Sequence, residues 1–507
     1  MSTDPAVASG EAPRTPLAHT DQPNWAAYTR FAVIAAVAGW ALFAVVGVVN
    51  YTTATSHAAD ANAKFEKAKA ESASKPDDID HAADEKKHAD DEVHDAKSRF
   101  MTAYLSGYTY WLSLPPGAMV LLMLRYVAKT SWGLLLTRPL EAATRTLPLT
   151  AVFFLPLAAS VAFKDHATHE APFSPYWWSN PAHAPTEDVS HAPTDNPGDK
   201  RVQTEKIGKM HMNKAIADRV AEERRERDEG IYGFLSVPGY IGVSAVIFLI
   251  WGAMMFLLNK WGKETSDATD PRLIDRGLEK LQNISGPGLI VFAITATAAA
   301  TLWVMSVEPG WSSTMFPVIF AVNTFLTTLT FSVALFLTLA GRPPFAKFMR
   351  PKFQLDMATL MLVFTLFWSY TSFSQFMLVW IGNLPEEIPF YLKRSSHTWW
   401  WYVSAALVAL HFALPFLLLL FRGIKLHPVR LRVVAFYLMV ICAVDVIWWI
   451  APSAPEHGHV PAVLMDIGAL LGLGGVWLMF WVYQMKQRPI FPDNQAFLLP
   501  EGHAHGH

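Results

Sequence analysis

Residues 373–387 read FSQFMLVWIGNLPEE, and this stretch indicates the fold of the whole chain. It closes an apolar run over 357–381 that contains one glutamine, Gln375, and it ends in the adjacent carboxylates Glu386 and Glu387. A run of about 20 apolar residues is long enough to cross a bilayer as a helix. Because hydrocarbon penalises a buried polar group, the amide of Gln375 needs a hydrogen-bond partner or a functional role there.

Similar apolar runs recur along the whole chain, whose 507 residues are 52% hydrophobic and only 17% charged. A soluble protein of this length carries more charge. We therefore expect an all-α polytopic membrane protein with about ten transmembrane helices. The first run is longer than the apolar part of a secretory signal, so it is expected to be a retained helix. The expected spans are 27–49, 102–125, 147–163, 237–259, 287–306, 315–341, 357–381, 399–421, 430–450 and 461–485.

Lysine and arginine are distributed unevenly over the short loops between these spans. Loops 307–314 and 451–460 contain neither residue, and 382–398 contains only Lys393 and Arg394. The loops rich in both are 126–146, 260–286, 342–356 and 422–432. Since cytoplasmic loops carry the excess of positive charge, both termini, 1–26 and 486–507, are expected on the cytoplasmic side.

Two long polar segments, 50–101 and 164–236, are expected on the opposite, outer side. In the first, Pro76 followed by two aspartates is typical of a helix start, and apolar residues at helical spacing predict that this helix continues into the second span. In the second, alternating glutamate and arginine predict a helix over 203–229. These segments are either solvated, salt-bridged surfaces or docking surfaces for partner subunits.

Several classes of function are disfavoured by composition. The net charge is −2 and no basic patch is present, so a nucleic-acid partner is not expected. The single cysteine, Cys442, excludes a Cys-ligated iron–sulfur cluster, a c-type haem attachment and an internal disulfide. His411 is the one histidine deep inside an expected span, whereas bis-histidine haem ligation needs two. The His-rich tail 501–507 lacks the accompanying ligands of a dedicated metal site, so no metal is assigned.

Polar side chains gather in the outer half of the expected spans. A charged side chain deep in the membrane costs roughly 2.5–3.5 kcal/mol, so Asp445 and Asp466 are expected to face the bundle interior and to pair, stay protonated or touch water. One interpretation is a proton path or quinol site that opens outward. In the other interpretation, the carboxylates only cap helix ends and the histidine only packs against its neighbours. The candidate residues are Glu308, Asn323, Gln375, Glu386, Glu387, His411, Asp445 and Asp466.

Several motifs resemble one family. Residues 306–316 (SVEPGWSSTMF), the 373–387 stretch, 444–448 (VDVIW) and 466–468 (DIG) are similar to motifs of the ActF-type NrfD/PsrC-like integral subunit of bacterial alternative complex III. That complex is a quinol:electron acceptor oxidoreductase of the respiratory chain. The similarity covers about 287–485.

The resemblance implies a particular architecture and location. It implies two four-helix bundles, one within 102–306 and one within 307–450, flanked by the span 27–49 and by the last span within 451–485. It also implies that the protein lies in the bacterial inner (cytoplasmic) membrane. The long outer segments 50–101 and 164–236 depart from the family pattern, which leaves open which subunits they contact.

The resemblance also implies the role of this subunit. It would support the quinol-oxidising core and carry a proton route, with Gln375, Asp445 and Asp466 as candidates and no catalytic residue of its own. Quinol or quinone is the only ligand implied, with no haem, iron–sulfur cluster or covalently bound cofactor in this subunit. The implied partners are a multihaem cytochrome c, an iron–sulfur subunit, a larger NrfD-like subunit, lipids and a terminal oxidase.

Two alternative functions stay open. The first is a quinol-binding NrfD-type membrane anchor of another redox complex. The second is a stand-alone proton-coupled transporter, which predicts inverted repeats and broken helices around a site at the membrane midplane. The sequence shows no such pair of segments, so this alternative ranks last.

Overall fold

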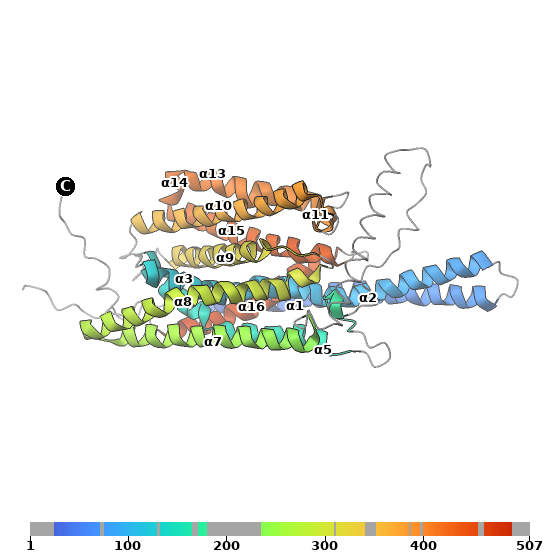
Figure 1. Ribbon diagram of the computed structural model, residues 1–507, viewed down its shortest axis with the longest axis horizontal. Helices are drawn as coiled ribbons and strands as arrows, with labels where there is room; N and C mark the ends of the chain where they lie inside the picture. The colour runs from blue at the N-terminus through green and yellow to red at the C-terminus, as the bar shows by residue number, and fades with distance from the viewer. Residues whose placement is uncertain are drawn as a thin grey trace, which may run out of the picture.

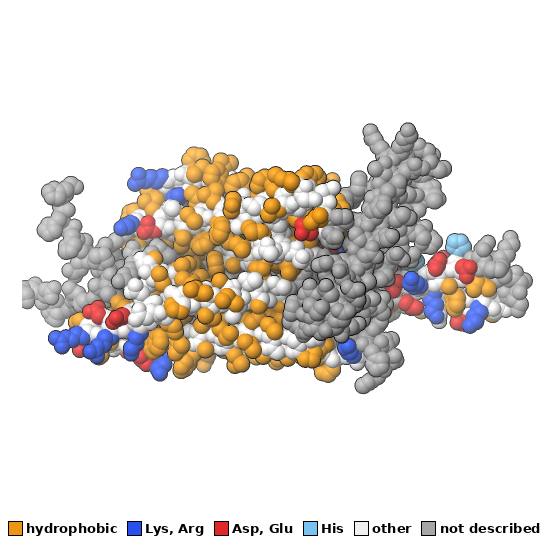
Figure 2. Space-filling view, viewed as in Figure 1, with side chains coloured by type: hydrophobic (Ala, Val, Ile, Leu, Met, Phe, Trp, Pro, Cys, Tyr) orange, Lys and Arg blue, Asp and Glu red, His pale blue; other side chains and the backbone are white. Residues whose placement is uncertain are grey.

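The computed structural model describes residues 25–70, 76–128, 132–164, 171–179, 235–308, 311–339, 351–384, 387–395, 399–454 and 461–488. Every regular element in these ranges is a helix, and ten helices are long and apolar enough to cross a membrane (Figure 1). Figure 2 shows hydrophobic side chains over the middle of the visible face, with charged side chains gathered toward its ends. The expectation of an all-α polytopic membrane protein is confirmed.

The helices follow the expected spans closely, although several extend beyond them. The spans are formed by α1 (Trp25–Ala70), α2 (Pro76–Leu112) with α3 (Leu114–Ala128), α4 (Trp132–Thr144) with α5 (Leu147–Ala162), α7 (Val237–Asp267), α8 (Pro271–Trp303), α9 (Phe316–Leu339), α10 (Pro351–Gly382), α12 (Trp400–Leu407) with the π-helical η6 (Val408–Ala413) and α13 (Leu414–Leu420), α15 (Pro428–Ile450) and α16 (Val463–Lys486). The short elements are η2 (Trp177–Ser179), η4 (Met305–Val307), α11 (Pro389–Ser395), α14 (Arg422–Lys425) and η7 (Ala451–Ser453).

The bundle has two ends along its length. α8, α10 and α15 finish at one end, which we call the Glu308 end. α3, α7 and α16 finish at the other, which we call the Glu141 end (Figure 1). The described parts of the basic loops of the sequence lie at the Glu141 end. The predictions for Glu386, for the helix over 203–229 and for the tail 501–507 concern residues outside the described ranges.

Prolines interrupt the second span but not the third. α2 ends at Leu112 and α3 begins at Leu114, so the helix is interrupted directly before Pro115 and Pro116. Proline lacks the N–H that would continue the hydrogen-bond ladder, and its ring clashes with the preceding turn. Pro156, by contrast, lies inside the continuous helix α5.

The polar segment after the first span forms a helical extension. The last third of α1 and the first half of α2 form an antiparallel pair that projects beyond the bundle at the Glu308 end (Figure 1). Lys64 Nζ lies 3.0 Å from Glu85 Oε2, and His57 Nδ1 lies 3.2 Å from Glu92 Oε2. α2 begins at Pro76 and runs without a break to Leu112, as its sequence predicts.

Glycines let α1 pack tightly against α16, the first span against the last. A Cβ added at Gly39 would lie 2.2 Å from the backbone nitrogen of Gly472, and one added at Gly475 would lie 2.3 Å from that of Ala36. Real side chains do not fit at such distances, so only glycine permits this approach. Close backbone packing through small residues is the usual way in which helices associate within a membrane.

The remaining spans pack as two groups of helices that meet along α2, α3, α9 and α15. α3, α5, α7 and α8 lie together with α2, while α10, α12–α13 and α15 lie together with α9 (Figure 1). The Tyr110 hydroxyl on α2 donates to the Met439 carbonyl on α15 at 3.0 Å and joins the two groups. Most of the sequence-predicted polar residues lie in the second group.

Candidate functional site

Asp445 is the centre of a buried polar cluster in the second group of helices. It lies on α15 with 1% of its surface exposed, so it faces the interior as expected. Its Oδ2 accepts hydrogen bonds from Asn323 Nδ2 on α9 and from Trp368 Nε1 on α10, both at 2.8 Å. Two donors from two other helices therefore hold one carboxylate oxygen in place. Asn323 Oδ1 in turn accepts from the Thr327 hydroxyl at 3.1 Å.

His411 completes this cluster from the fourth helix of the group. Its ring stacks on Trp368 with centroids 3.7 Å apart, and its Nδ1 lies 3.9 Å from Asp445 Oδ2. On the other side, His411 Nε2 lies 3.7 Å from the Cys442 sulfur. The residue belongs to the π-helical turn η6, and such single-turn widenings occur frequently at functional sites. Cys442 is buried, as predicted, but it packs against a polar partner.

We call Asp445, Asn323, Trp368, His411 and Cys442 the Asp445 cluster. His411 Nδ1 has no hydrogen-bond partner among the described residues, and it faces the carboxylate. A carboxyl group and an imidazole in this relation can exchange a proton after a shift of about 1 Å, because a proton passes at hydrogen-bond distances near 2.6–3.2 Å. Trp368 and Asn323 orient the carboxylate for this exchange.

The abundant hydroxyls of α9 and α10 do not extend this cluster into a chain. Apart from Thr327, they mostly bond to carbonyls three or four residues earlier in their own helices, which is the ordinary arrangement in a membrane helix. Such bonds are made by Thr328, Thr330, Thr365 and Thr371. Most of these hydroxyls therefore bond within their own helix and form no link to the Asp445 carboxylate.

Gln375 lies on α10, outside the Asp445 cluster. It is buried and interacts with the hydroxyl of Tyr391, but its Oε1 has no partner among the described residues. Burial raises the pKa of Tyr391 above its ordinary value, so this hydroxyl stays protonated. The following Asn383 ends α10 with a positive φ of 47°, a conformation that asparagine tolerates at helix ends. Glu387 lies in the turn before α11 and is not part of the Asp445 cluster.

Asp466 forms a second, separate buried pair. It lies in the first turn of α16 and accepts from Arg99 Nη2 on α2, and both side chains are almost completely buried. The other guanidinium nitrogens of Arg99, Nε and Nη1, have no hydrogen-bond partner among the described residues. The sequence did not single out Arg99, because it lies among the many charges of 50–101. The pair ties the last span to the base of the helical extension.

Glu308 forms a third cluster, at the end of the bundle named after it. Its carboxylate pairs with Lys393 of α11, accepts from the Ser453 hydroxyl at 2.6 Å and lies 3.9 Å from Arg394 Nη1. Burial by itself would raise the pKa of this carboxyl group. The two cations and the hydrogen bonds outweigh that effect and lower the pKa below its ordinary value. Glu308 is therefore a fixed anion that joins three connecting segments.

Arg394 explains why the loop 382–398 departs from the charge pattern of the other loops. Its guanidinium donates to the carbonyls of Trp448 at 3.0 Å and Trp449 at 2.9 Å, in the last turn of α15, and to Phe390 at 2.6 Å. A cation at a helix C-terminus is favourable because the last carbonyls have no partners in the helix. Burial lowers its pKa to about 10, so Arg394 is still a cation near neutral pH.

The Glu308 cluster predicts a specific dependence of stability on pH. Because the folded-state pKa of Glu308 is lowered, its contribution is fully present above the unfolded value of about 4.3 and is lost as the pH falls through the folded value. The difference in unfolding midpoint between the wild type and Glu308→Gln, measured by thermal denaturation in detergent, should therefore be largest near neutral pH and shrink below about pH 4. Glu279→Gln, at an exposed position of α8, serves as the control. A difference that stays constant from pH 7 to pH 3 would contradict this assignment.

Comparisons with known proteins identify no family. No family model matches the sequence, and no curated protein is detectably similar to it. The resemblance to subunits of alternative complex III therefore stays a prediction. Within the described residues, no group of three or more His, Cys, Asp or Glu side chains is arranged to hold a metal ion.

Proposed function

We propose that this protein is an integral membrane subunit of a respiratory quinol:electron acceptor oxidoreductase of the alternative complex III type. It would lie in the bacterial inner membrane with both termini in the cytoplasm. The motifs within 306–468 support the family, and the Asp445 cluster supports the chemistry. The cluster is the observation that carries the proposal, because a carboxylate so deeply buried is expensive unless it has a function or complete pairing.

The proposed chemistry is the handling of the protons that quinol releases. Oxidation of a quinol to a quinone releases two protons with two electrons, and the electrons would leave through redox centres in partner subunits. Asp445 would accept a proton while Trp368 and Asn323 orient its carboxylate, and His411 would pass it on. Asp445 lies five residues before the end of α15, about 8 Å from the Glu308 end. An outward path from it is therefore short.

The proposed partners are a multihaem cytochrome c, an iron–sulfur subunit and a larger NrfD-like subunit, with a terminal oxidase as a further associate. The helical extension of α1 and α2 supports this assignment, because a charged, rigid pair of helices beyond the membrane-spanning part offers a surface for proteins on that side. The role of this chain would be to support the quinol-oxidising core, without a redox centre of its own.

The proposal is tested by isolating the protein from its native membranes in a mild detergent. The expected result is a complex in which mass spectrometry identifies c-type cytochrome and iron–sulfur subunits, with haem absorbance and quinol oxidation activity in the same fraction. A homogeneous protein that purifies alone, without haem, and that catalyses proton-coupled uptake in vesicles would instead support the transporter alternative.

A second candidate function is quinol binding by this subunit itself. It is favoured by the buried, unpartnered Oε1 of Gln375 beside the protonated hydroxyl of Tyr391, since an acceptor and a hydroxyl suit the two kinds of oxygen in quinol and quinone. We expect Gln375→Leu to weaken binding of a soluble ubiquinone or menaquinone analogue about tenfold, as measured by quenching of tryptophan fluorescence. Gln354→Leu, at a buried position near the other end of α10, is the control. Equal affinity in both variants and the wild type would rule out this site.

A further inference from the structure

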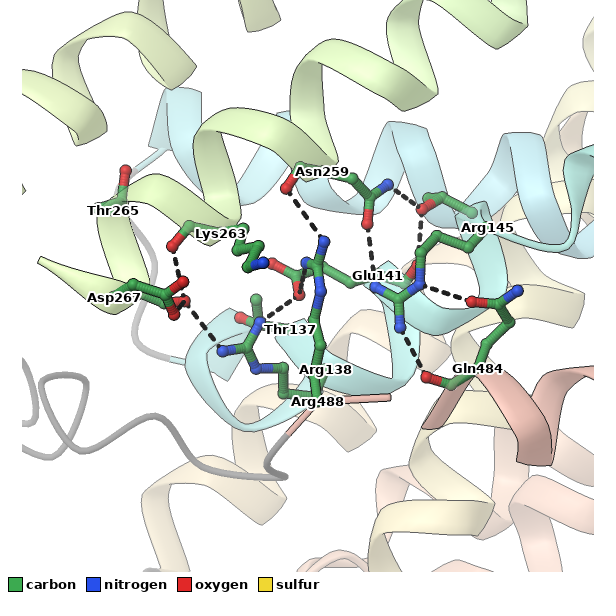
Figure 3. A network of polar contacts seen from close by, with 12 residues as sticks. Thr137, Arg138, Glu141, Arg145, Asn259, Lys263, Thr265, Asp267, Gln484 and Arg488 are labelled. Carbon is green, nitrogen blue, oxygen red and sulfur yellow. Dashed lines mark hydrogen bonds and ion pairs between the residues drawn. The ribbon is translucent and has the colours of Figure 1, made fainter. Parts of the chain in front are cut away.

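The Glu141 end of the bundle contains a cluster of arginines with too few anions around it. Figure 3 shows Arg138 of α4 and Arg488, which follows α16, at the carboxylate of Glu141, with Arg145 of the turn after α4 close by. Arg125 on α3 lies beside them and donates to the Thr137 hydroxyl. We call these four arginines and Glu141 the Glu141 cluster. None of its members was singled out by the sequence analysis.

One carboxylate serves two of the arginines. Glu141 Oε2 accepts from Arg138 Nη1 at 2.5 Å and from Arg488 Nη1 at 3.2 Å. Arg138 Nη2 also donates to the Ser266 hydroxyl on α7 at 3.1 Å, while its Nε has no partner among the described residues. α7 can pass this close because residue 262 is glycine, where an added Cβ would lie 2.9 Å from Glu141 Oε1.

Arg145 forms no hydrogen bond or ion pair with a carboxylate among the residues that the structure describes. It donates to the side-chain oxygen of Gln484 at 3.0 Å, to the backbone carbonyl of Gln484 at 2.8 Å and to Asn259 Oδ1 at 3.1 Å (Figure 3). All three acceptors are neutral. A carbonyl at a helix C-terminus supplies only part of an elementary charge, so these bonds orient the guanidinium without neutralising it.

The charged groups near the cluster do not restore the balance. Lys263 on α7 is exposed and adds another positive charge, and Asp267 is exposed and reaches the Ser266 hydroxyl only at 3.5 Å. Tyr126 packs beside Arg125 as an aromatic neighbour. Among the described residues, Glu141 is the one carboxylate that contacts this group of four arginines, and it contacts only Arg138 and Arg488. Arg125 and Arg138 are each about 95% buried. Charges buried without compensation are strongly destabilising, so the part of this cluster that the structure describes has fewer anions than its arginines require.

We infer that the Glu141 cluster binds an anion of the phosphate type. The planar guanidinium of arginine matches the geometry of phosphate oxygens and pairs with them more strongly than with neutral acceptors. Basic pockets between transmembrane helices, at the level of the lipid headgroups, bind anionic lipid headgroups in this way. Among the described residues, Arg138 Nε has no partner and Arg145 contacts no carboxylate, so these are the groups that would receive the ligand. This inference does not depend on the proposed respiratory function.

The phosphate could belong to a phospholipid or be free in solution. An exposed apolar strip on α7 runs from the cluster toward the middle of the bundle, with Phe256 59% and Leu249 73% exposed. Acyl chains of a lipid held by its headgroup would lie along such a strip. Free phosphate would need only the arginines.

The experiment compares full-length wild-type protein with Arg145→Gln, a change that removes a charge with no acidic partner. Arg430→Gln, at an exposed position on α15 at the same end, is the matched control. The unfolding temperature is measured in detergent with added phosphatidylcholine, phosphatidylglycerol, cardiolipin or inorganic phosphate, and retained phospholipid is quantified by mass spectrometry after detergent exchange. We expect anionic ligand to stabilise the wild type and the control, and the apparent affinity of Arg145→Gln to be about tenfold weaker.

The possible results distinguish a lipid headgroup, a soluble phosphate and the absence of an anion site. Stabilisation by phosphatidylglycerol or cardiolipin, but not by inorganic phosphate, identifies a lipid headgroup, whereas stabilisation by both identifies a site for soluble phosphate. If Arg145→Gln does not fold, Arg145→Lys keeps the charge, loses the planar fork and should bind with intermediate affinity. A wild type that no anion stabilises and that retains no anionic phospholipid would overturn the inference, as would equal affinity in Arg145→Gln and Arg430→Gln.

Discussion

Replacing Asp466 by alanine is expected to lower the free energy of unfolding by about 3–5 kcal/mol. The substitution leaves the guanidinium of Arg99 buried between α2 and α16 without its counter-charge, and two of its nitrogens have no partner among the described residues. An uncompensated charge in an apolar interior is penalised far more than the loss of one surface ion pair, which is worth about 1 kcal/mol or less. Unfolding in mixed micelles with increasing SDS measures the change.

A double variant separates the missing counter-charge from the loss of packing. Arg99→Met combined with Asp466→Leu removes both charges and keeps apolar volume, so it should recover most of the lost stability. Asp275→Ala, at an exposed position of α8, should change stability by less than about 0.5 kcal/mol. If Asp466→Ala were no less stable than Asp275→Ala, the buried pair would contribute nothing to the fold.

Asp445→Asn is expected to reduce quinol oxidation and the associated proton release about a hundredfold, the lower range for loss of a positioned acid–base group. Asparagine has nearly the same size, and its carbonyl can still accept from Trp368, so the unfolding temperature should change little. An amide, however, cannot take up and release a proton. The effect is measured on the purified complex, with turnover followed spectroscopically and proton release by a pH-sensitive dye in vesicles.

The control for this variant is Asp275→Asn, which makes the same chemical change at an exposed position. His411→Gln should reproduce part of the loss, because it removes the second exchangeable group of the Asp445 cluster and keeps a polar side chain. Full turnover and full proton release in Asp445→Asn would remove the proton route from the proposal and leave a supporting role for this subunit.

The number and positions of the spans were predictable because a continuous apolar run has one main explanation at this length. The helix ends were less predictable. α8 begins at Pro271 rather than near 287, since its first four turns are polar and resemble a loop in composition. α4 was not expected at all, because Arg138 and Glu141 made it look like part of a cytoplasmic loop. Burial against α3, α7 and α16 keeps this charged helix within the bundle.

The candidate site was predictable residue by residue, but not as an arrangement. Asn323, His411 and Asp445 stood out because each is a polar group within an apolar span, and the structure brings the three together. Trp368 did not stand out, since tryptophan is common throughout the chain and its indole donor is not visible in a sequence. His411 lies in a π-helical turn that contacts α10 and α15, and no local sequence pattern encodes such contacts. Glu308, Gln375 and Asp466, equally conspicuous in the sequence, lie in other clusters.

The contact of α1 with α16 has a consequence for how the protein is made. Gly39 meets Gly472 and Ala36 meets Gly475, so α1 packs against a helix that leaves the ribosome about 430 residues later. At a synthesis rate of about 5–20 residues per second, α1 is in the bilayer for roughly 20–90 s before α16 has been synthesised. Its hairpin with α2 forms early and is the one neighbour at hand during this interval. Premature association of the small-residue face of α1 with other membrane proteins is therefore the hazard that biogenesis of this chain has to avoid.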